Sequence, residues 1–288
     1  MSPIIDIENV TIEYPGNGAR VLALDGATLR VDAGETVGLV GESGSGKTTL
    51  GLLAGRLLPR SARVTGGQLR IDGQDVLALD DQRLRALRRE CLGYIPQDPV
   101  AALDPTMRIG RQLELVLHGL PSDTASLRHH LDSVQISEPD RVLRLFPHEI
   151  SGGMAQRVMI AMAMARTPRL LVADEPTASL DSHVRTEVTK LIFNLAAKAG
   201  ATVLWLSHDL RSVSRWCERV VVMYGGKVME DGPAAQVLRH PTHPYTIALA
   251  ASDPARAEPG QRIGTRPFDP AASGTEMPSA KLAVGGGR

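Results

Sequence analysis

The sequence contains few cysteines, no excess of charge of either sign and no long hydrophobic run. Only two of its 288 residues are cysteine, Cys91 and Cys217, so the chain cannot build a disulfide framework or a four-thiolate cluster. Lys+Arg and Asp+Glu both number 32, which gives a formal net charge of zero, whereas nucleic-acid binding needs clustered positive charge. We therefore expect a protein of a reducing compartment that has no nucleic-acid partner.

The missing hydrophobic run bears on membranes. The longest uninterrupted apolar stretch is Val158–Ala165, whereas a helix that crosses a bilayer needs about 20 apolar residues. Asp6 follows Met1 too closely for a signal-peptide apolar region to develop between them, so we expect no secretory signal. If the protein works at a membrane, we expect another chain to carry the membrane part.

The pattern of apolar residues predicts an α/β domain over residues 1–252. Alternation predicts two strands, Ile4–Glu13 and Val21–Val31, and a short apolar run predicts a buried strand at Thr36–Val40. Further predicted strands are Gly66–Asp72, Leu92–Pro96, Arg169–Ala173, Ala201–Leu206 and Val220–Tyr224. Predicted helices run from the glycine-rich segment after residue 40 to Leu58, and over Asp80–Glu90, Ser182–Lys198 and Leu210–Cys217. Strands separated by helices indicate a parallel sheet with crossover connections.

Two segments depart from this alternation. Residues 98–165 are mostly helical in pattern, which indicates an inserted helical lobe. Residues 253–288 are rich in proline, glycine and alanine and have no apolar period. We expect this C-terminal tail to be poorly ordered.

A glycine-rich segment follows the predicted buried strand and fits the pattern G-x-x-x-x-G-K-[ST]. It comprises Gly41, Glu42, Ser43, Gly44, Ser45, Gly46, Lys47 and Thr48, followed by Thr49. Its glycines allow backbone N–H groups to point at phosphate oxygens, and the following helix N-terminus adds positive dipole. Lys47 would bind the β- and γ-phosphates, and the Thr48 hydroxyl would ligate Mg²⁺. A glycine-rich turn with an exposed lysine is the alternative, and the strand before and helix after favour nucleotide binding.

A pair of acids ends another apolar strand. Asp174 and Glu175 are adjacent, and neighbouring strand residues face opposite sides, so the two carboxylates can do different work. Asp174 could support Mg²⁺, while Glu175 could polarise the water that attacks the γ-phosphate. Alone, such an acid could instead cap a helix or pair with an arginine. His208 follows the next predicted strand and could hydrogen-bond the γ-phosphate or steady that water, although a lone histidine is more often structural.

The segment Ile150–Arg157 gives the chain a specific resemblance. Ser151, Gly152 and Gly153 open a second anion-binding helix N-terminus, and with Gln156 they are similar to the signature motif of ATP-binding-cassette (ABC) transporters. The resemblance implies a P-loop NTPase (RecA-like) core with an antiparallel β subdomain and an inserted α-helical subdomain, and it implies ATP and Mg²⁺ as ligands. In this family, two subunits meet head to tail, and the signature of one covers ATP on the phosphate loop of the other.

Other motifs follow in the family's order over residues 4–232. Tyr14 resembles the aromatic residue that stacks on adenine, and Gln97 resembles the glutamine of the loop that contacts Mg²⁺ or water. Ser179-Leu180-Asp181 resembles the D-loop at the dimer interface, and His208 matches the switch histidine. Each would be unremarkable alone, and their joint order carries the resemblance.

The segment His240–Thr246 resembles the His-Pro-Tyr segment of oligopeptide, dipeptide and nickel importer ATPases. This resemblance implies a second ABC ATPase subunit (a heterodimer over a homodimer), two transmembrane permease subunits, an extracytoplasmic substrate-binding protein and a place on the cytoplasmic face of the membrane. Peptides are the cargo it implies first, with nickel or another small solute as the alternative. Because residues 253–288 contain no cysteine, we predict no iron–sulfur cluster there.

Three alternatives stay open. His240 and His243 could ligate a metal, although no carboxylate or thiolate partner is evident nearby. The chain could be an ABC-type ATPase of DNA repair or translation, although it has no coiled coil, zinc module or second cassette. It could also bind ATP without hydrolysing it, which the presence of Lys47, Asp174 and Glu175 disfavours.

Overall fold

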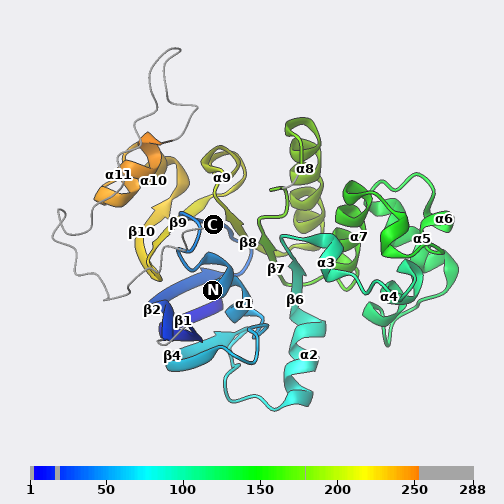
Figure 1. The fold of residues 1–288 in the computed structure, drawn as a ribbon, viewed down its shortest axis with the longest axis horizontal. Helices are drawn as coiled ribbons and strands as arrows, with labels where there is room; N and C mark the ends of the chain where they lie inside the picture. Colours follow the sequence, from blue (N-terminus) through cyan, green and yellow to red (C-terminus); the bar gives the residue numbers. More distant parts are fainter. Residues whose placement is uncertain (1–2, 17–19, 179, 253–288) are drawn as a thin grey trace, which may run out of the picture. The chain divides into compact units, whose positions relative to one another are not determined.

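The computed structural model describes residues 3–16, 20–178 and 180–252. Contacts divide the chain into two compact units (Figure 1). Unit 1 comprises residues 1–4, 32–37 and 78–206, and unit 2 comprises residues 5–31, 38–77 and 207–288. The predicted tail and Ser179 lie outside the described residues, and the predicted domain boundaries stay a prediction.

Unit 2 contains a four-stranded sheet in the order β2-β1-β4-β5. The strands are β1 (Pro3–Pro15), β2 (Arg20–Asp32), β4 (Arg63–Ile71) and β5 (Gln74–Asp75). β4 runs antiparallel to both β1 and β5. The apolar residues that predicted β1 by alternation, including Ile5, Ile7 and Ile12, are fully buried, because successive side chains of a strand face opposite sides.

The rest of unit 2 surrounds the C-terminal half of β3 (Thr36–Val40), which is followed by the glycine-rich loop. Strands β10 (Lys227–Pro233), β9 (Arg219–Tyr224) and β3 lie in that order, and β10 pairs antiparallel with β9. The helices are α1 (Lys47–Ala54), α9 (Leu210–Trp216), α10 (Ala234–Arg239) and α11 (Pro244–Ala251). A Cβ on Gly38 would lie 2.4 Å from Val213 Cγ1, so α9 packs closely on β3.

Unit 1 is built on the parallel strands β8 (Thr202–Ser207), β7 (Leu170–Asp174) and β6 (Leu92–Ile95), in that order. Every described side chain of β7 and β8 is buried. Such strands need covering on both faces, and this explains their continuous apolar sequence. The predicted parallel pairing is confirmed for these three strands.

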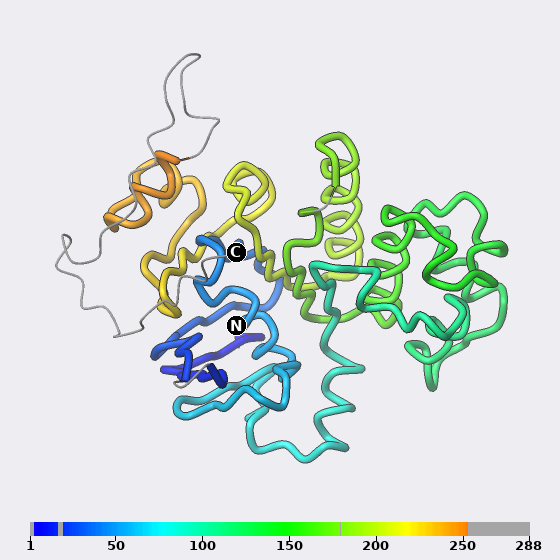
Figure 2. Tube along the Cα trace, in the orientation of Figure 1, coloured from blue at the N-terminus to red at the C-terminus, as the bar shows by residue number. Residues whose placement is uncertain are grey.

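Unit 1 also contains several helices, of which α3 to α7 lie together in the trace (Figure 2). They are α2 (Asp81–Cys91), α3 (Pro99–Ala102), α4 (Ile109–Val116), α5 (Thr124–Ser133), α6 (Pro139–Val142), the 3₁₀ turn η1 (Pro147–Glu149), α7 (Gly152–Met164) and α8 (Ser182–Ala199). α7 contacts α3, α4, α5, α8 and β6. Val158 and Ile160 of α7 are buried, as are Leu113 of α4 and Leu131 of α5. Helices that bury apolar residues and contact α7 account for the pattern that predicted a helical lobe.

Two local predictions differ from the structure. The helix predicted to reach Leu58 ends at Ala54, because Arg56 takes a left-handed backbone (φ 47°) and donates from its side chain to Val76 O at 3.2 Å. The helices α10 and α11 and strand β10 had no predicted counterpart. Among the described residues, no helix combines the length and apolarity that crossing a bilayer requires.

Candidate functional site

The glycine-rich loop has a backbone that most other residues could not adopt. Gly41, Gly44 and Gly46 all have positive φ, at 154°, 81° and 103°. A Cβ on Gly41 would lie 2.2 Å from Met223 O, and one on Gly46 would lie 2.7 Å from Ala23 O. The glycines are therefore needed both for conformation and for close approach to the neighbouring backbone.

Lys47 is folded into this loop, and its side chain is 5% exposed. Its Nζ donates to Gly41 O at 2.8 Å and to Glu42 O at 2.9 Å, and lies 3.5 Å from Ser45 Oγ. The ammonium group is thus held inside the curve of the loop. Burial of a cation at the start of α1 gives this end of the helix a strong positive field.

The loop also presents groups to its surroundings. Glu42, Ser43, Gly44 and Thr48 are exposed, whereas Ser45 is buried and Gly46 and Thr49 are half-buried. Gly46, the N-cap of α1, has no side chain that could accept a hydrogen bond from the first N–H groups of the helix. Exposed N–H groups, a hydroxyl and a neighbouring ammonium are the chemistry that a polyphosphate requires.

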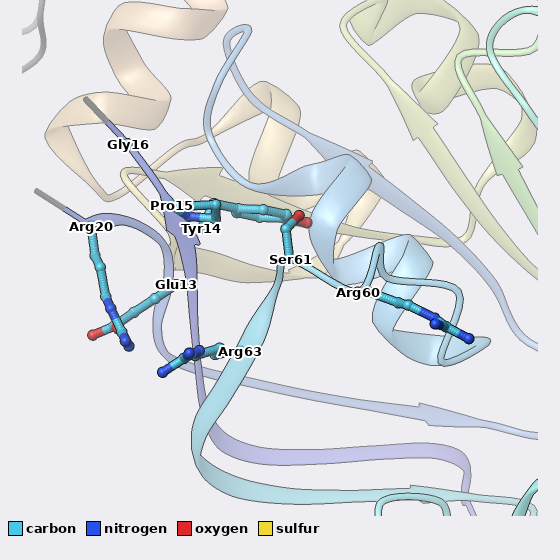
Figure 3. Close-up of a pocket in the computed structure, with 8 residues that line it drawn as sticks. All are labelled: Glu13, Tyr14, Pro15, Gly16, Arg20, Arg60, Ser61 and Arg63. Atoms are coloured by element: carbon cyan, nitrogen blue, oxygen red, sulfur yellow. The ribbon is translucent and has the colours of Figure 1, made fainter. Parts of the chain in front are cut away.

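Tyr14 lies near α1. Its hydroxyl is 3.5 Å from Thr49 Oγ1, and its ring lies beside Ser61 in a pocket of 490 Å³ (Figure 3). Arg20, Arg60 and Arg63 also line this pocket. Arg20 forms an ion pair with Glu13 at 2.8 Å. The structure therefore places the half-buried Tyr14 ring next to Thr49, in a pocket of unit 2 that is also lined by arginines.

The two adjacent acids of unit 1 have different surroundings. Asp174 ends β7 and is 2% exposed, and its Oδ2 accepts a hydrogen bond from the Tyr94 hydroxyl at 3.1 Å. Glu175 is half-buried and has a left-handed backbone (φ 43°), and its N–H donates to Leu206 O at 3.0 Å. The two carboxylates therefore differ in burial, and their separate roles stay a prediction.

Tyr94 is a site residue that the sequence did not single out. Burial raises the pKa of Tyr94 first, and the negative charge of Asp174 and the hydrogen bond to it raise this pKa further. The phenol is therefore a neutral donor at physiological pH, and it fixes one oxygen of the Asp174 carboxylate. The only signal in the sequence was its place on the strand that precedes Gln97.

His208 is exposed and follows β8 directly. The next residue, Asp209, caps α9 by accepting from Arg211 N at 3.0 Å, and its own N–H donates to Ser207 Oγ at 2.9 Å. The imidazole therefore sits in a turn that is fixed on both sides by side-chain hydrogen bonds.

The signature segment opens α7 in unit 1. Ser151 is the N-cap, and its Oγ accepts from Met154 N at 3.3 Å. Ser151 and Gly152 are exposed and Gly153 is half-buried. Gln156 is 1% exposed, so the structure does not place its side chain at the exposed helix N-terminus. The expected contact of Gln156 with a ligand stays a prediction.

Gln97 and Asp181 both lie next to helix starts in unit 1. Gln97 is exposed and precedes Asp98, whose carboxylate caps α3. Asp181 caps α8, and its Oδ1 accepts from His183 N at 3.1 Å and from Val184 N at 3.0 Å. Asp181 therefore has a structural role as an N-cap, and Ser179 lies outside the described residues.

The two histidines of the His-Pro-Tyr segment show no metal-site geometry. Among the described residues no group of three or more His, Cys, Asp or Glu side chains could hold a metal ion. His243 instead caps α11, and its Nδ1 accepts from Tyr245 N at 3.1 Å. Tyr245 accepts a hydrogen bond from Glu42 N at 3.0 Å, which connects this segment to the glycine-rich loop.

The predicted site residues are divided between the units. Unit 2 holds Tyr14, the residues from Gly41 to Thr49, and His208, and unit 1 holds Gln97, Ser151, Gly152, Gly153, Gln156, Asp174, Glu175 and Asp181. Most of these residues lie at the end of a strand or at the start of a helix. Such ends are where α/β proteins bind ligands.

Comparisons with known proteins add to this geometry. A family model described as ABC transporter matches residues 24–178. The probable D,D-dipeptide transport ATP-binding protein of Escherichia coli is 41% identical over 271 residues, which cover 92% of this chain and 83% of that protein. The oligopeptide transport ATP-binding protein of Haemophilus influenzae is 37% identical, with 94% of this chain and 85% of that protein covered.

A solved structure has the same fold. It is a dimeric ATP-binding cassette in a post-hydrolysis state bound to ADP and Pi, with a TM-score of 0.71 and 29% identity. The match covers 80% of this chain and 98% of that cassette.

Proposed function

Because the chain belongs to the ABC transporter family, we propose that it is the subunit that binds and hydrolyses ATP to energise an importer of dipeptides or oligopeptides. The predicted family and P-loop cassette fold are confirmed, and the chain is an ATPase of this family. The names of two relatives that cover more than nine-tenths of the chain, one for D,D-dipeptide and one for oligopeptide transport, support peptides as cargo. Nickel or another small solute is the alternative cargo.

The glycine-rich loop is proposed to hold the phosphates of ATP. Its N–H groups and the α1 N-terminus would bind phosphate oxygens, and the Lys47 ammonium would exchange its bonds to loop carbonyls for bonds to the β- and γ-phosphates. Tyr14 would stack on adenine. The Lys47 side chain is already buried and held by the loop carbonyls, which supports this role. It loses little conformational freedom when phosphate oxygens replace those carbonyls.

Glu175 is proposed as the general base for the attacking water. It is the less buried of the two acids, so water can reach it, while Asp174 is already committed to the hydrogen bond from Tyr94. His208, in its fixed turn, would hydrogen-bond the γ-phosphate, and Gln97 would contact the water. These assignments place the proton of the water on the Glu175 carboxylate in the hydrolytic step.

Mg²⁺ is the proposed metal, and the donor set fits it. The Thr48 hydroxyl, the Asp174 carboxylate and the Gln97 amide offer oxygen atoms, which are the ligands that Mg²⁺ prefers. The protein offers few such ligands, which suits an ion that keeps waters and binds phosphate oxygens. When bound, Mg²⁺ would neutralise part of the charge on the β- and γ-phosphates.

A second ABC ATPase subunit is the proposed partner of the signature segment. The exposed Ser151 hydroxyl and the N–H groups of Gly152 and Gly153 would contact the γ-phosphate of ATP held by that partner. Asp181 would lie at the same dimer interface. The family's head-to-tail pairing supports this arrangement, and we favour a heterodimer.

A permease helix is the proposed occupant of a groove of 520 Å³ in unit 1. Its lining includes Met107, Leu115, Met159 and Met162, with Arg88 among the polar residues. Leu115 is 51% exposed, and methionines adapt to varied apolar partners. Two permease subunits and an extracytoplasmic substrate-binding protein would complete the importer, with this chain on the cytoplasmic face of the membrane.

The observation that carries the proposal is the complete set of cassette motifs in a chain that aligns with a dipeptide-transport relative over 92% of its length. The test is affinity purification of the tagged full chain from membranes of its native host. We expect two permease proteins, a second ABC ATPase and a co-encoded binding protein that retains a peptide. A binding protein that retains nickel and rejects peptides would overturn the peptide assignment, and purification without any permease would overturn the transport assignment.

A further inference from the structure

The second residue of helix α11 is a fully buried tyrosine that has no part in the functions described above. Tyr245 is 0% exposed, and its ring lies 4.5 Å from that of Tyr224, measured between centroids. A buried phenol hydroxyl usually has a hydrogen-bond partner. Here that partner is in the phosphate loop.

The contact is a hydrogen bond to the backbone of the loop. Glu42 N–H donates to the Tyr245 hydroxyl at 3.0 Å, while the carbonyl of the same residue accepts from Lys47 Nζ at 2.9 Å. Glu42 is therefore held at both of its peptide groups. Its own side chain is exposed, so the fixed part of this residue is its backbone.

The helix that carries Tyr245 is itself anchored. Glu230 on β10 accepts three hydrogen bonds from the segment before α11: Thr242 N at 2.9 Å, Thr242 Oγ1 at 2.9 Å and His243 N at 3.1 Å. His243 then caps the helix by accepting from Tyr245 N at 3.1 Å. These hydrogen bonds fix the start of α11, and therefore the position of Tyr245, without any contribution from the phosphate loop.

We propose that Tyr245 is a positioning residue for ATP binding, which fixes the first turn of the phosphate loop and couples helix α11 to the nucleotide. The mechanism is preorganisation: the hydroxyl holds the Glu42 peptide, and this peptide carries one of the carbonyls against which Lys47 is placed. Less ordering is then needed when phosphate binds. The inference rests on the proposed phosphate-loop role and does not depend on the cargo.

The state of the phenol suits this task. Burial raises the pKa of Tyr245 to about 12, with smaller contributions from the Glu42 N–H, which lowers it, and from nearby Glu42 and Tyr224. The hydroxyl is neutral at physiological pH, so it accepts from Glu42 and keeps a proton to donate. Coupling is reciprocal, so ATP binding is expected to stabilise α11 as α11 stabilises the loop.

The test compares Tyr245→Phe, which keeps the ring and removes the hydroxyl, with Ser252→Ala. Ser252 donates its Oγ to Ala248 O at 2.9 Å at the other end of α11, so its substitution loosens the helix away from the loop. We expect Tyr245→Phe to raise the Kd of the full chain for ATP about fivefold by titration calorimetry, the typical effect of one neutral hydrogen bond. Ser252→Ala should change this Kd less than twofold.

Two readouts separate positioning from general destabilisation. In a hydrolysing preparation, Tyr245→Phe should raise KM for ATP by the same factor and leave kcat within about twofold, as expected for loss of ground-state binding. Hydrogen exchange should show faster exchange of the Glu42 amide without ATP. ATP should slow exchange across α11 in the unchanged protein but not in the variant.

The outcomes are distinct. If Tyr245→Phe leaves the Kd and the Glu42 amide exchange unchanged, the inference is overturned. If its Kd rises only in proportion to a fall in melting temperature that Ser252→Ala reproduces, Tyr245 is structural and the inference is also overturned. Lys47→Ala serves as the reference: retention of ATP binding by that variant would remove the phosphate-loop assignment itself, independently of Tyr245.

Discussion

Two helix N-termini of this protein present glycine and a small polar residue, but they differ in how they are built. Helix α1 follows a loop in which Lys47 and Ser45 are buried, and Gly46 offers it no side-chain cap. Helix α7 begins at an exposed end, where Ser151 caps the helix through Met154 N. The N-terminus of α1 therefore encloses the charged Lys47 side chain. The N-terminus of α7 is exposed, and its own serine caps it.

The glycines at the two ends carry the same contrast. A Cβ on Gly41 would meet Met223 O at 2.2 Å, whereas one on Gly152 would meet no atom within 4 Å among the described residues. The fold of this chain therefore requires glycine at 41 but not at 152. The proposed close approach of a nucleotide held by a partner subunit would give a reason for glycine at 152.

The largest expected effect separates chemistry from binding. Glu175 shares unit 1 with the open end, and Glu175→Gln should lower ATP hydrolysis by the assembled transporter by about 10²–10⁴-fold, because the base is lost. The Kd for ATP should stay within about threefold. The matched control is Glu187→Gln, an exposed carboxylate of the same unit. Hydrolysis at the unchanged rate would remove Glu175 from its proposed role.

The next effect concerns the enclosed end. Lys47→Ala removes the ammonium group that the loop holds, and charge-assisted hydrogen bonds to phosphate go with it. We expect the Kd for ATP to rise by about 10–100-fold, as measured by calorimetry on the full chain. Lys227→Ala, which removes a lysine paired with Asp25 in the same unit, should leave the Kd unchanged. An unaltered Kd in Lys47→Ala would contradict the assignment.

A pair of glycine substitutions addresses the contrast directly. Gly41→Ala should lower the free energy of unfolding by about 1–3 kcal/mol and weaken ATP binding, because its φ and its neighbour both exclude a Cβ. Gly152→Ala should leave stability unchanged or raise it by up to about 1 kcal/mol, since alanine favours helix. Chemical denaturation measures both. Equal destabilisation by the two substitutions would erase the distinction between an enclosed and an open end.

The smallest expected effect separates two roles of Ser151, as the N-cap of α7 and as the proposed contact to ATP. Ser151→Ala and Asp123→Ala each remove an N-cap from a helix of unit 1, since Asp123 caps α5 through Ser126 N at 2.8 Å. Each should cost about 1 kcal/mol of stability. Only Ser151→Ala should also slow hydrolysis in the assembled transporter, by about tenfold for one lost hydrogen bond to a charged phosphate. A similar loss in both variants would reduce Ser151 to a cap.

The sequence predicted those parts of the site whose chemistry is local. The glycine-rich loop, the acid pair and the Ser151 helix start are contiguous patterns, and each has the expected strand or helix beside it. The α1 boundary was missed although the sequence carries a signal for it: Gly55 is the C-cap of α1, and Arg56 beside it takes a left-handed conformation. The ligand contact of Gln156 was predicted from its position in the signature segment, whereas the burial of its side chain depends on which face of α7 meets the core.

The tyrosine contacts could not be predicted for a different reason. Tyr94 reaches Asp174 across 80 positions of sequence, and Tyr245 reaches Glu42 across 203. Such pairs depend on strand order and helix packing, which no local period encodes. All four tyrosines of the chain nevertheless contact a predicted site residue or the ring of one that does, because a phenol combines apolar burial with one polar group.

One measurement tests most directly whether the open end serves another subunit's nucleotide. With Ser151→Cys in this chain, an ATP analogue that carries a thiol-reactive γ-phosphate is added to the assembled transporter, and the cross-linked thiol is quantified. We predict that cross-linking persists when Lys47→Ala is added to the same chain and disappears when the phosphate-loop lysine of the partner ATPase is replaced. Cross-linking that instead depends on Lys47 of the same chain would contradict the account.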